Sequence, residues 1–227
     1  MKLKYLLNKS TKKNIRSVIR FIRNINKKKY SKFNNYWIQC VKIKSVPNRI
    51  EYFKKICTNK KIIHFGCTDW PIFNPNKNLH IELSKCTNLL HGFDIDLEGI
   101  ENLRHHVNQD YFSDFSEIPN IQYDVCLIPE TIEHVDNVKL FLENVSLINA
   151  NIFVITAPNC FSKEHITRNF YGRDQFIELV HPDHNCWYSP YTLKNQIEKY
   201  SNLKVSDVIL LEKDTIVCCI ARKNGEI

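Results

Sequence analysis

From residue 61 onward the chain alternates short apolar runs with stretches of helical periodicity, and this alternation restricts the fold more than any other feature. The stretches DVCLI (124–128) and IFVIT (152–156) are almost continuously apolar, which is typical of parallel strands covered on both faces. Alternating strands and helices predict an open, doubly wound α/β sheet. The expected strands are 61–65, 89–94, 123–128, 151–156, 203–211 and 215–221, and the expected helices are 78–86, 97–106, 136–148 and 190–200.

Local signals refine both ends of this series. The last two expected strands are separated by a short turn at Glu212 to Asp214, so we expect them to form an antiparallel hairpin. Ser189 and Pro190 are a favourable N-cap and first residue for the last helix. A short helix around Phe53 should precede the first strand.

Charge divides the 227-residue chain into two parts. Residues 1–50 contain 15 Lys and Arg and no acidic residue, whereas residues 51–227 carry 17 basic and 24 acidic side chains, a net charge of −7. We therefore expect a basic arm (1–50) attached to one folded domain (51–227).

Within the arm, apolar residues at three- and four-residue steps from Ile15 to Ile25 predict an amphipathic basic helix. Three roles are open for residues 1–30: peripheral contact with an anionic membrane, contact with RNA phosphates, or packing on the body of the protein itself. Of the two external partners we favour the membrane, and nucleic acid is the less expected partner because the body is acidic.

Compartment signals favour the cytoplasm. The nine cysteines show neither a zinc-binding spacing nor a disulfide framework. Such cysteine usage is typical of a reducing compartment. The sequence also contains no apolar run of about 18 residues and no secretory signal, so a cytoplasmic protein with possible peripheral attachment is expected.

Polar residues follow the carboxyl ends of the expected strands, where ligands bind in open α/β sheets. Strand 61–65 is followed by a turn that begins at Gly66, and strand 89–94 ends at an acid suited to accept ribose hydroxyls. A further acid-aromatic pair precedes the central strand, which itself ends at a Pro-Glu pair. The candidate ligand contacts are Gly66, Cys67, Thr68, Asp94, Ile95, Asp110, Tyr111, Pro129 and Glu130.

Taken in this order, these segments resemble the class I S-adenosylmethionine-dependent methyltransferases over roughly residues 58–222. IIHFGCTDW resembles the glycine-loop motif and LLHGFDID the ribose-binding motif. YDVCLIPETIEHVDNVKLFLENV, IFVITAPN and HPDHNCWYSPYTLKNQIEKY resemble later motifs of the small-molecule branch, of type 11/23. The turn GCTDWP also resembles a variant in a subgroup associated with surface glycans.

The resemblance implies a Rossmann-like seven-stranded sheet in the order 3-2-1-4-5-7-6, with strand 7 antiparallel. It implies S-adenosyl-L-methionine as the cofactor and places the adenine beside Asp110, Tyr111 and Ile95. Two positions of the loop depart from the family, since Thr68 and Trp70 stand where glycines are usual. We expect Thr68 to donate a hydrogen bond to the cofactor carboxylate and the turn to remain functional.

A hydroxyl acceptor needs a base, for which histidine is the default side chain. His181 and His184 bracket Asp183 in the segment HPDH, and His134 follows Glu133 after the central strand. We expect His184 to be the base, with Asp183 or Glu130 orienting it. For His181, Asp183 and His134, the alternative to a catalytic role is a purely structural one.

No metal is expected, because two histidines and one carboxylate this close together, with Pro182 between them, make a poor cage. Trp187, Tyr188 and Tyr171 are candidates for stacking on a sugar ring.

The function indicated is S-adenosylmethionine-dependent O-methylation of a sugar hydroxyl in a surface polysaccharide, lipid-linked glycan or nucleotide-sugar. Two alternatives remain. One is a methyltransferase acting on another small molecule or on RNA, although the tetrad IPET after the central strand is unlike motifs that methylate base amino groups. The other is a non-catalytic scaffold that retains the fold and has lost the cofactor, which the altered glycine loop favours.

Overall fold

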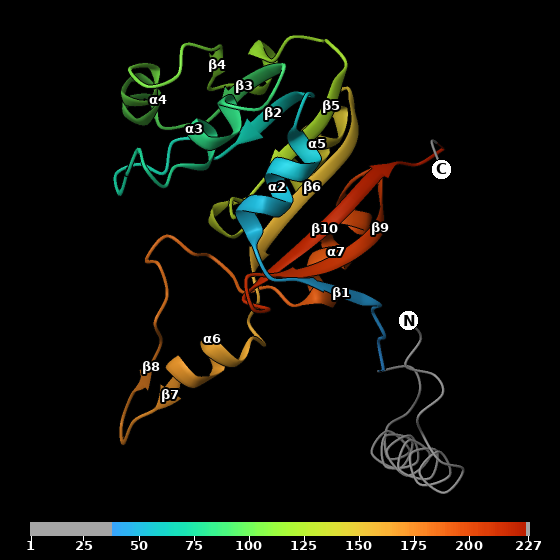
Figure 1. Ribbon diagram of the computed structural model, residues 1–227. Coiled ribbons are helices and arrows are strands. Elements are labelled where there is room, and N and C mark those ends of the chain that lie inside the picture. Colours follow the sequence, from blue (N-terminus) through green and yellow to red (C-terminus); the bar gives the residue numbers. More distant parts are fainter. Residues whose placement is uncertain (1–37, 226–227) are drawn as a thin grey trace, which may run out of the picture. The chain divides into compact units, whose positions relative to one another are not determined.

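The computed structural model describes residues 38–225, and the amphipathic helix expected near residues 15–25 lies outside this range. The compact unit begins at Val41. Its centre is a mixed, mostly parallel sheet of eight strands, in the order β1-β9-β10-β6-β5-β2-β3-β4 (Figure 1). The strands are β1 (Ile43–Val46), β2 (Lys61–Phe65), β3 (Leu89–Phe93), β4 (Tyr111–Phe112), β5 (Tyr123–Ile128), β6 (Ala150–Pro158), β9 (Leu203–Leu211) and β10 (Ile216–Lys223).

The sheet has eight strands where seven were expected, because β1 pairs in parallel with β9 at one edge. β1 comes from the segment that the sequence analysis placed in the basic arm. The expected terminal hairpin is present, since β10 runs antiparallel to both β9 and β6. Its turn places Glu212, Lys213 and Asp214 at positive φ.

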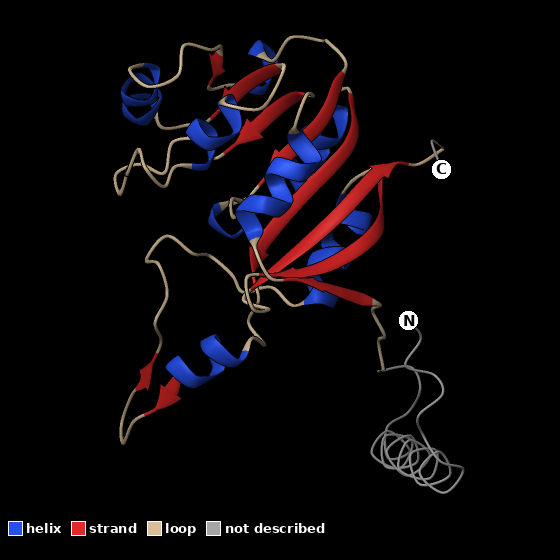
Figure 2. Cartoon of the chain, viewed as in Figure 1, coloured by secondary structure: helices blue, strands red, loops and turns tan. Residues whose placement is uncertain are grey.

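Helices alternate with strands along the chain, as the sequence predicted, and Figure 2 distinguishes the two by colour. Most begin at an Asn, Asp or Ser side chain that accepts a hydrogen bond from the first turn, for example Asn78 from the Ile81 amide and Ser189 from the Thr192 amide. None of the helices within residues 38–225 is long and apolar enough to cross a bilayer. The helices are α2 (Arg49–Cys57), α3 (Leu79–Ser84), α4 (Leu97–Arg104), α5 (Val138–Leu147), α6 (Lys163–Arg168) and α7 (Pro190–Tyr200), with 3-10 turns at Phe115–Glu117 and Ile132–His134.

Both faces of the sheet are buried, which explains the continuous apolar runs. Along β5, Val125 and Leu127 contribute to one cluster with Phe53 of α2, while Cys126 and Ile128 contribute to another that includes residues of α5 and α7. Alternate residues of β5 therefore pack against helices on opposite faces of the sheet, as expected for a doubly wound sheet. All nine cysteines are free thiols.

Residues between β6 and α7 form an excursion that the sequence analysis did not predict. It contains α6 and a two-stranded sheet of its own, β7 (Phe170–Tyr171) paired antiparallel with β8 (Phe176–Ile177). Strands this short carry little periodicity in the sequence. The excursion leads into the loop 178–189, which carries the HPDH segment.

Candidate functional site

The turn after β2 is built around Gly66. This residue has φ of +63°, a conformation that glycine adopts without strain. A Cβ atom at this position would lie 2.5 Å from Oγ1 of Thr131, which follows β5. The glycine is therefore required both by backbone conformation and by the close approach of the segment after the central strand.

The next residue with a defined role, Thr68, has a different partner from the one expected. Its amide and its hydroxyl both donate to Oδ2 of Asp94, at 3.1 and 2.8 Å, and its side chain is 2% exposed. The expectation that Thr68 donates to the cofactor carboxylate is therefore not met in this structure. Asp94 also accepts from the Asp96 amide at 3.1 Å, so the carboxylate is fixed in orientation and retains capacity for about one more donor.

The buried side-chain amide of Asn78 holds this turn by hydrogen bonds. The Nδ2 group of Asn78 donates to the carbonyl of Cys67 and to Oδ2 of Asp69, both at 3.0 Å. The Cys67 side chain points into a small cluster with Ile100, Leu103 and Tyr111 and not toward a ligand. The turn is therefore rigid without a glycine-rich sequence.

Helix α4 packs directly against the altered turn. A Cβ atom on Gly99 would lie 2.7 Å from Thr68 Cβ and 2.8 Å from Trp70 Cβ. Trp70 is partly exposed beside this contact, and Ile95, the expected adenine neighbour, is 82% exposed in the loop between β3 and α4. A large apolar side chain exposed next to Asp94 is suited to contact a ligand base.

The position of β4 changes the expected adenine contacts. Asp110 precedes β4 and is exposed beside His91, whereas the carboxyl end of β4 is at Ser113 and Asp114. Tyr111 is 7% exposed and its hydroxyl donates to the Val107 carbonyl at 2.9 Å, so it is a packed residue and not the flank of a ring. Ligands bind at carboxyl ends, so Asp114 replaces Asp110 as the candidate acid.

Asp114 has a sequence signature that we had not used. It caps the 3-10 turn Phe115–Glu117 in a capping box with Glu117, and its carboxylate accepts from the Ser116 amide and hydroxyl, which hold its pKa below the ordinary value. The Asp-x-x-Glu spacing is readable from the sequence. A capping box at this point would have indicated where the two-residue strand ends.

The carboxyl end of β5 carries a charged pair. Pro129 is buried, and Glu130 has φ of +46° with its amide donating to the Thr156 carbonyl at 3.1 Å. The Glu130 carboxylate is bound by the guanidinium of Arg49, the first residue of α2. Arg49 was assigned to the arm in the sequence analysis, and its proximity to the site follows from the packing of α2 on the sheet.

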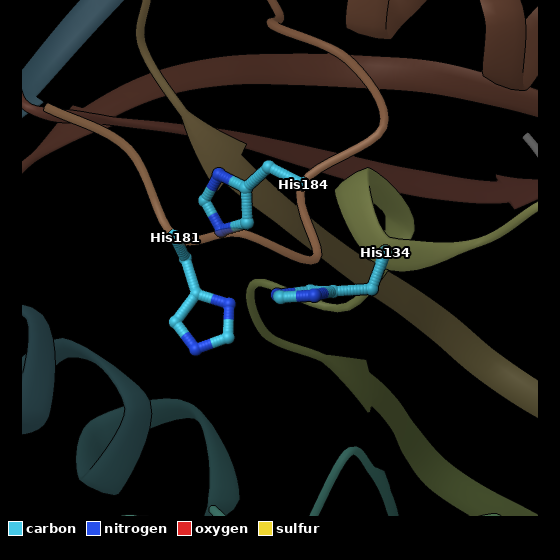
Figure 3. A group of neighbouring side chains, drawn as sticks. All are labelled: His134, His181 and His184. Atoms are coloured by element: carbon cyan, nitrogen blue, oxygen red, sulfur yellow. The ribbon is translucent and has the colours of Figure 1, made fainter. Parts of the chain in front are cut away.

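Three histidines meet beside this pair. His134 ends the 3-10 turn after β5, and His181 and His184 come from the HPDH loop. One ring nitrogen of each histidine lies within 4.8 Å of the others, and Figure 3 shows the three rings facing a common space. The structure therefore brings together the three expected catalytic histidines, which the sequence placed in two separate segments.

The environment of the cluster favours the neutral form of two of its histidines, His134 and His184. Burial lowers the pKa of His134 and of His184 below the ordinary value, and the neighbouring imidazoles lower it further. Asp183 lies at the edge of the cluster, with Oδ2 3.7 Å from His181 Nδ1. Next to His134, burial raises the pKa of the Glu133 carboxyl to about 8.

The expected sugar-stacking residues are not brought together. Tyr188 is 1% exposed and belongs to the core, with its hydroxyl donating to Gln196. Tyr171 lies in β7 of the excursion, 86% exposed. Trp187 alone of the three lies near the histidines, with its ring centroid 6.3 Å from that of His184.

No protein-family model matches this sequence, and no curated protein matches it. Solved structures do match its fold. The chain aligns with a chain of the Pnkp1/Rnl/Hen1 RNA repair complex at TM-score 0.57 and 14% identity, covering 77% of this chain and 41% of that one. It aligns with a SAM-dependent methyltransferase from Aquifex aeolicus at TM-score 0.55 and 15% identity, and the alignment covers 77% of this chain and 89% of that one.

The DhpI–SAH complex aligns at TM-score 0.53 and 16% identity, over 78% and 82% of the two chains. The chain therefore has a fold shared with S-adenosylmethionine-dependent methyltransferases, as the sequence motifs indicated. It spans less than half of the matched chain of the RNA repair complex.

Proposed function

We propose that this protein is a methyltransferase that uses S-adenosyl-L-methionine to methylate a sugar hydroxyl. The observation that carries the proposal is the three-histidine cluster beside the carboxyl end of β5, on a sheet of methyltransferase type. Burial favours the neutral imidazoles of His134 and His184, and a neutral imidazole can accept the proton of a hydroxyl. A neutral amino acceptor can take the methyl group without first losing a proton, so a base at this position favours a hydroxyl acceptor.

The residues around Gly66 and Asp94 fit the cofactor. Asp94 is a fixed carboxylate with an acceptor site left for a ribose hydroxyl, the exposed Ile95 follows it directly, and Asp114 comes after the neighbouring strand β4. Asp69 and Glu130 provide negative charge and Arg49 positive charge beside the turn, a set suited to a ligand that carries both a sulfonium and a carboxylate. When bound, the cofactor supplies an electrophilic methyl group.

The chain's own contribution on the acceptor side is to hold and deprotonate the hydroxyl. The O–H proton passes to an imidazole, for which His184 is the first candidate, and the oxygen takes the methyl group. Asp183 and His181 orient this loop at its exposed edge. Transfer converts a positive sulfonium into a neutral thioether, so alignment in a site shielded from water is what the enzyme must provide.

The sugar acceptor is supported by the turn GCTDWP, which resembles that of the glycan-associated subgroup, and by Trp187 beside the histidines. The basic segment 1–30 is suited to an acceptor presented at an anionic membrane surface. Such an enzyme would work on the cytoplasmic side of that membrane.

Calorimetric titration with S-adenosylmethionine and S-adenosylhomocysteine tests the cofactor. We expect micromolar binding of both, lost in Asp94→Ala and retained in Asp124→Ala, which removes a carboxylate from the opposite, amino end of β5. A folded wild-type protein that binds neither ligand would contradict the proposal and favour the scaffold alternative. Full affinity in Asp94→Ala would show that the site is elsewhere.

A further inference from the structure

The imidazole rings of His134, His181 and His184 form a cluster with the geometry of a metal centre. They come from two segments that are distant in the sequence and converge in the fold (Figure 3). We propose that these three histidines bind one divalent transition-metal ion of the zinc class. No metal was expected from the sequence, because the two histidines and the carboxylate of HPDH alone make a poor cage. The third histidine comes from the 3-10 turn after β5.

The spacing of the nitrogens is close to that of a bound centre. Zinc–nitrogen bonds of 2.0–2.1 Å at tetrahedral angles place the ligand nitrogens about 3.3 Å apart. In the structure all three lie within 4.8 Å of one another. No pair has to close by more than about 1.5 Å, which small side-chain rotations can supply.

The rings have few competing partners. Within residues 38–225, Nδ1 of His184 is buried without a partner, and the one protein group hydrogen-bonded to the His134 ring is the backbone of Asp183. His181 Nδ1 accepts only a long hydrogen bond from the Asp183 amide, at 3.3 Å. Few other groups of the described residues therefore compete for these rings, and ring nitrogens that have no protein partner can bind a cation.

Both segments are fixed in place by Asn185. Its amide donates to the Glu133 carbonyl at 2.8 Å, and its Nδ2 group donates to the His134 carbonyl at 3.0 Å. The His184 amide donates to the His181 carbonyl at 3.1 Å, which closes the loop into a turn. The ligands are therefore held by backbone contacts that do not use their rings, as a preorganised site requires.

The donor set selects the kind of ion. Three neutral imidazoles suit Zn²⁺ and Co²⁺, whereas Mg²⁺ prefers oxygen ligands. Three protein ligands leave one coordination position open, as in catalytic and not structural zinc sites. If the proposed function holds, that position receives the acceptor hydroxyl; its O–H bond breaks, the oxygen stays on the ion and the proton leaves to solvent. The bound ion then takes over the activation of the hydroxyl that the proposed function gives to His184, which acts as the base only where no ion is bound.

Cobalt titration tests the site directly. The full chain without an affinity tag is stripped with chelator, and Co²⁺ is added while the visible d–d bands are recorded. We expect one equivalent to give the intense bands of a tetrahedral site and to be displaced by Zn²⁺. His134→Ala, His181→Ala and His184→Ala should each weaken binding by at least about 100-fold, since even residues that only support a ligand cost 10–100-fold.

His105→Ala is the matched control, because it removes an exposed histidine at the end of α4 and should leave the titration unchanged. Circular dichroism verifies folding of each variant, and His181→Ala, in the exposed loop, is the least disruptive. Absence of cobalt bands in the folded wild type, or unchanged affinity in the three variants, overturns the proposal. The metal-free protein is also titrated with S-adenosylhomocysteine, so failure of the cofactor site and failure of the metal site are separate results.

Discussion

Substitution of Gly66 by alanine tests the geometry of the turn after β2 quantitatively. Two costs are expected. A non-glycine residue at φ of +63° costs about 1–2 kcal/mol. The added Cβ would also lie 2.5 Å from Thr131 Oγ1, and overpacking of this kind typically costs about 1–3 kcal/mol. Gly66→Ala should therefore lower the free energy of unfolding by about 2–5 kcal/mol, the sum of the two costs.

The two costs can be separated by removing the atom that the new methyl group meets. Thr131→Ala deletes Oγ1, which donates to the Pro129 carbonyl at 3.0 Å, and alone should cost about 1 kcal/mol. In the double variant the overpacking cost disappears and only the backbone cost of Gly66→Ala remains. The coupling energy of the cycle should therefore be about 1–3 kcal/mol in the favourable direction.

Urea unfolding of the four proteins at one pH measures this coupling. Thr131→Val is the control, because it replaces the hydroxyl by a methyl group of similar size and should not relieve the contact. Additivity of Gly66→Ala and Thr131→Ala within about 0.5 kcal/mol would show that the two residues are not in contact, and our account of the turn would be wrong.

Two further predictions concern other parts of the molecule. Asp114→Ala should weaken binding of S-adenosylhomocysteine in calorimetry while Asp110→Ala leaves it unchanged, because only Asp114 follows β4; the reverse result would restore the original assignment. Burial keeps His64 and His80 neutral in the folded protein and lowers the pKa of His80 to about 3. As the pH falls, the unfolded chain therefore protonates these histidines before the folded protein does. Stability that is present above pH 6.5 should be lost as the pH falls toward 4. Each histidine adds up to about 1.4 kcal/mol per pH unit to the pH dependence of the unfolding free energy in this window. In urea unfolding at several pH values, His80→Gln should therefore show a smaller slope of unfolding free energy against pH. An unchanged slope would show that His80 is not the origin of the pH dependence.

Features of the fold that depend on local pattern were predicted well. Segments such as 61–65 and 123–128 are apolar because both their faces are buried, and this shows in the sequence directly. The strand β1 was missed because its side chains are mostly exposed and lie in a basic segment. Its place in the sheet depends on pairing with β9, a contact between distant parts of the chain.

Errors in the site have the same physical origin. The two-residue strand β4 has no periodicity to detect, so Asp110 was placed at its carboxyl end when it lies at its amino end. Thr68 was assigned a ligand contact because its hydroxyl is a donor, but that donor is used by Asp94, which is brought close by the pairing of β2 with β3. Residue type indicated which groups can donate or accept a hydrogen bond, and tertiary contacts decided which partner each group meets.

The segment from Pro129 to His134, part of a stretch that resembles a methyltransferase motif, contacts several parts of the protein. Thr131 packs against the glycine turn, the Glu130 carboxylate is bound by Arg49, and His134 belongs to the histidine cluster. Neighbouring positions thus have separate partners, in the turn after β2, in α2 and in the histidine cluster. Substitutions inside this segment will disturb these contacts together, so the roles of its residues are best separated through partners that lie outside it, Arg49 for Glu130 and Asn185 for the histidine cluster.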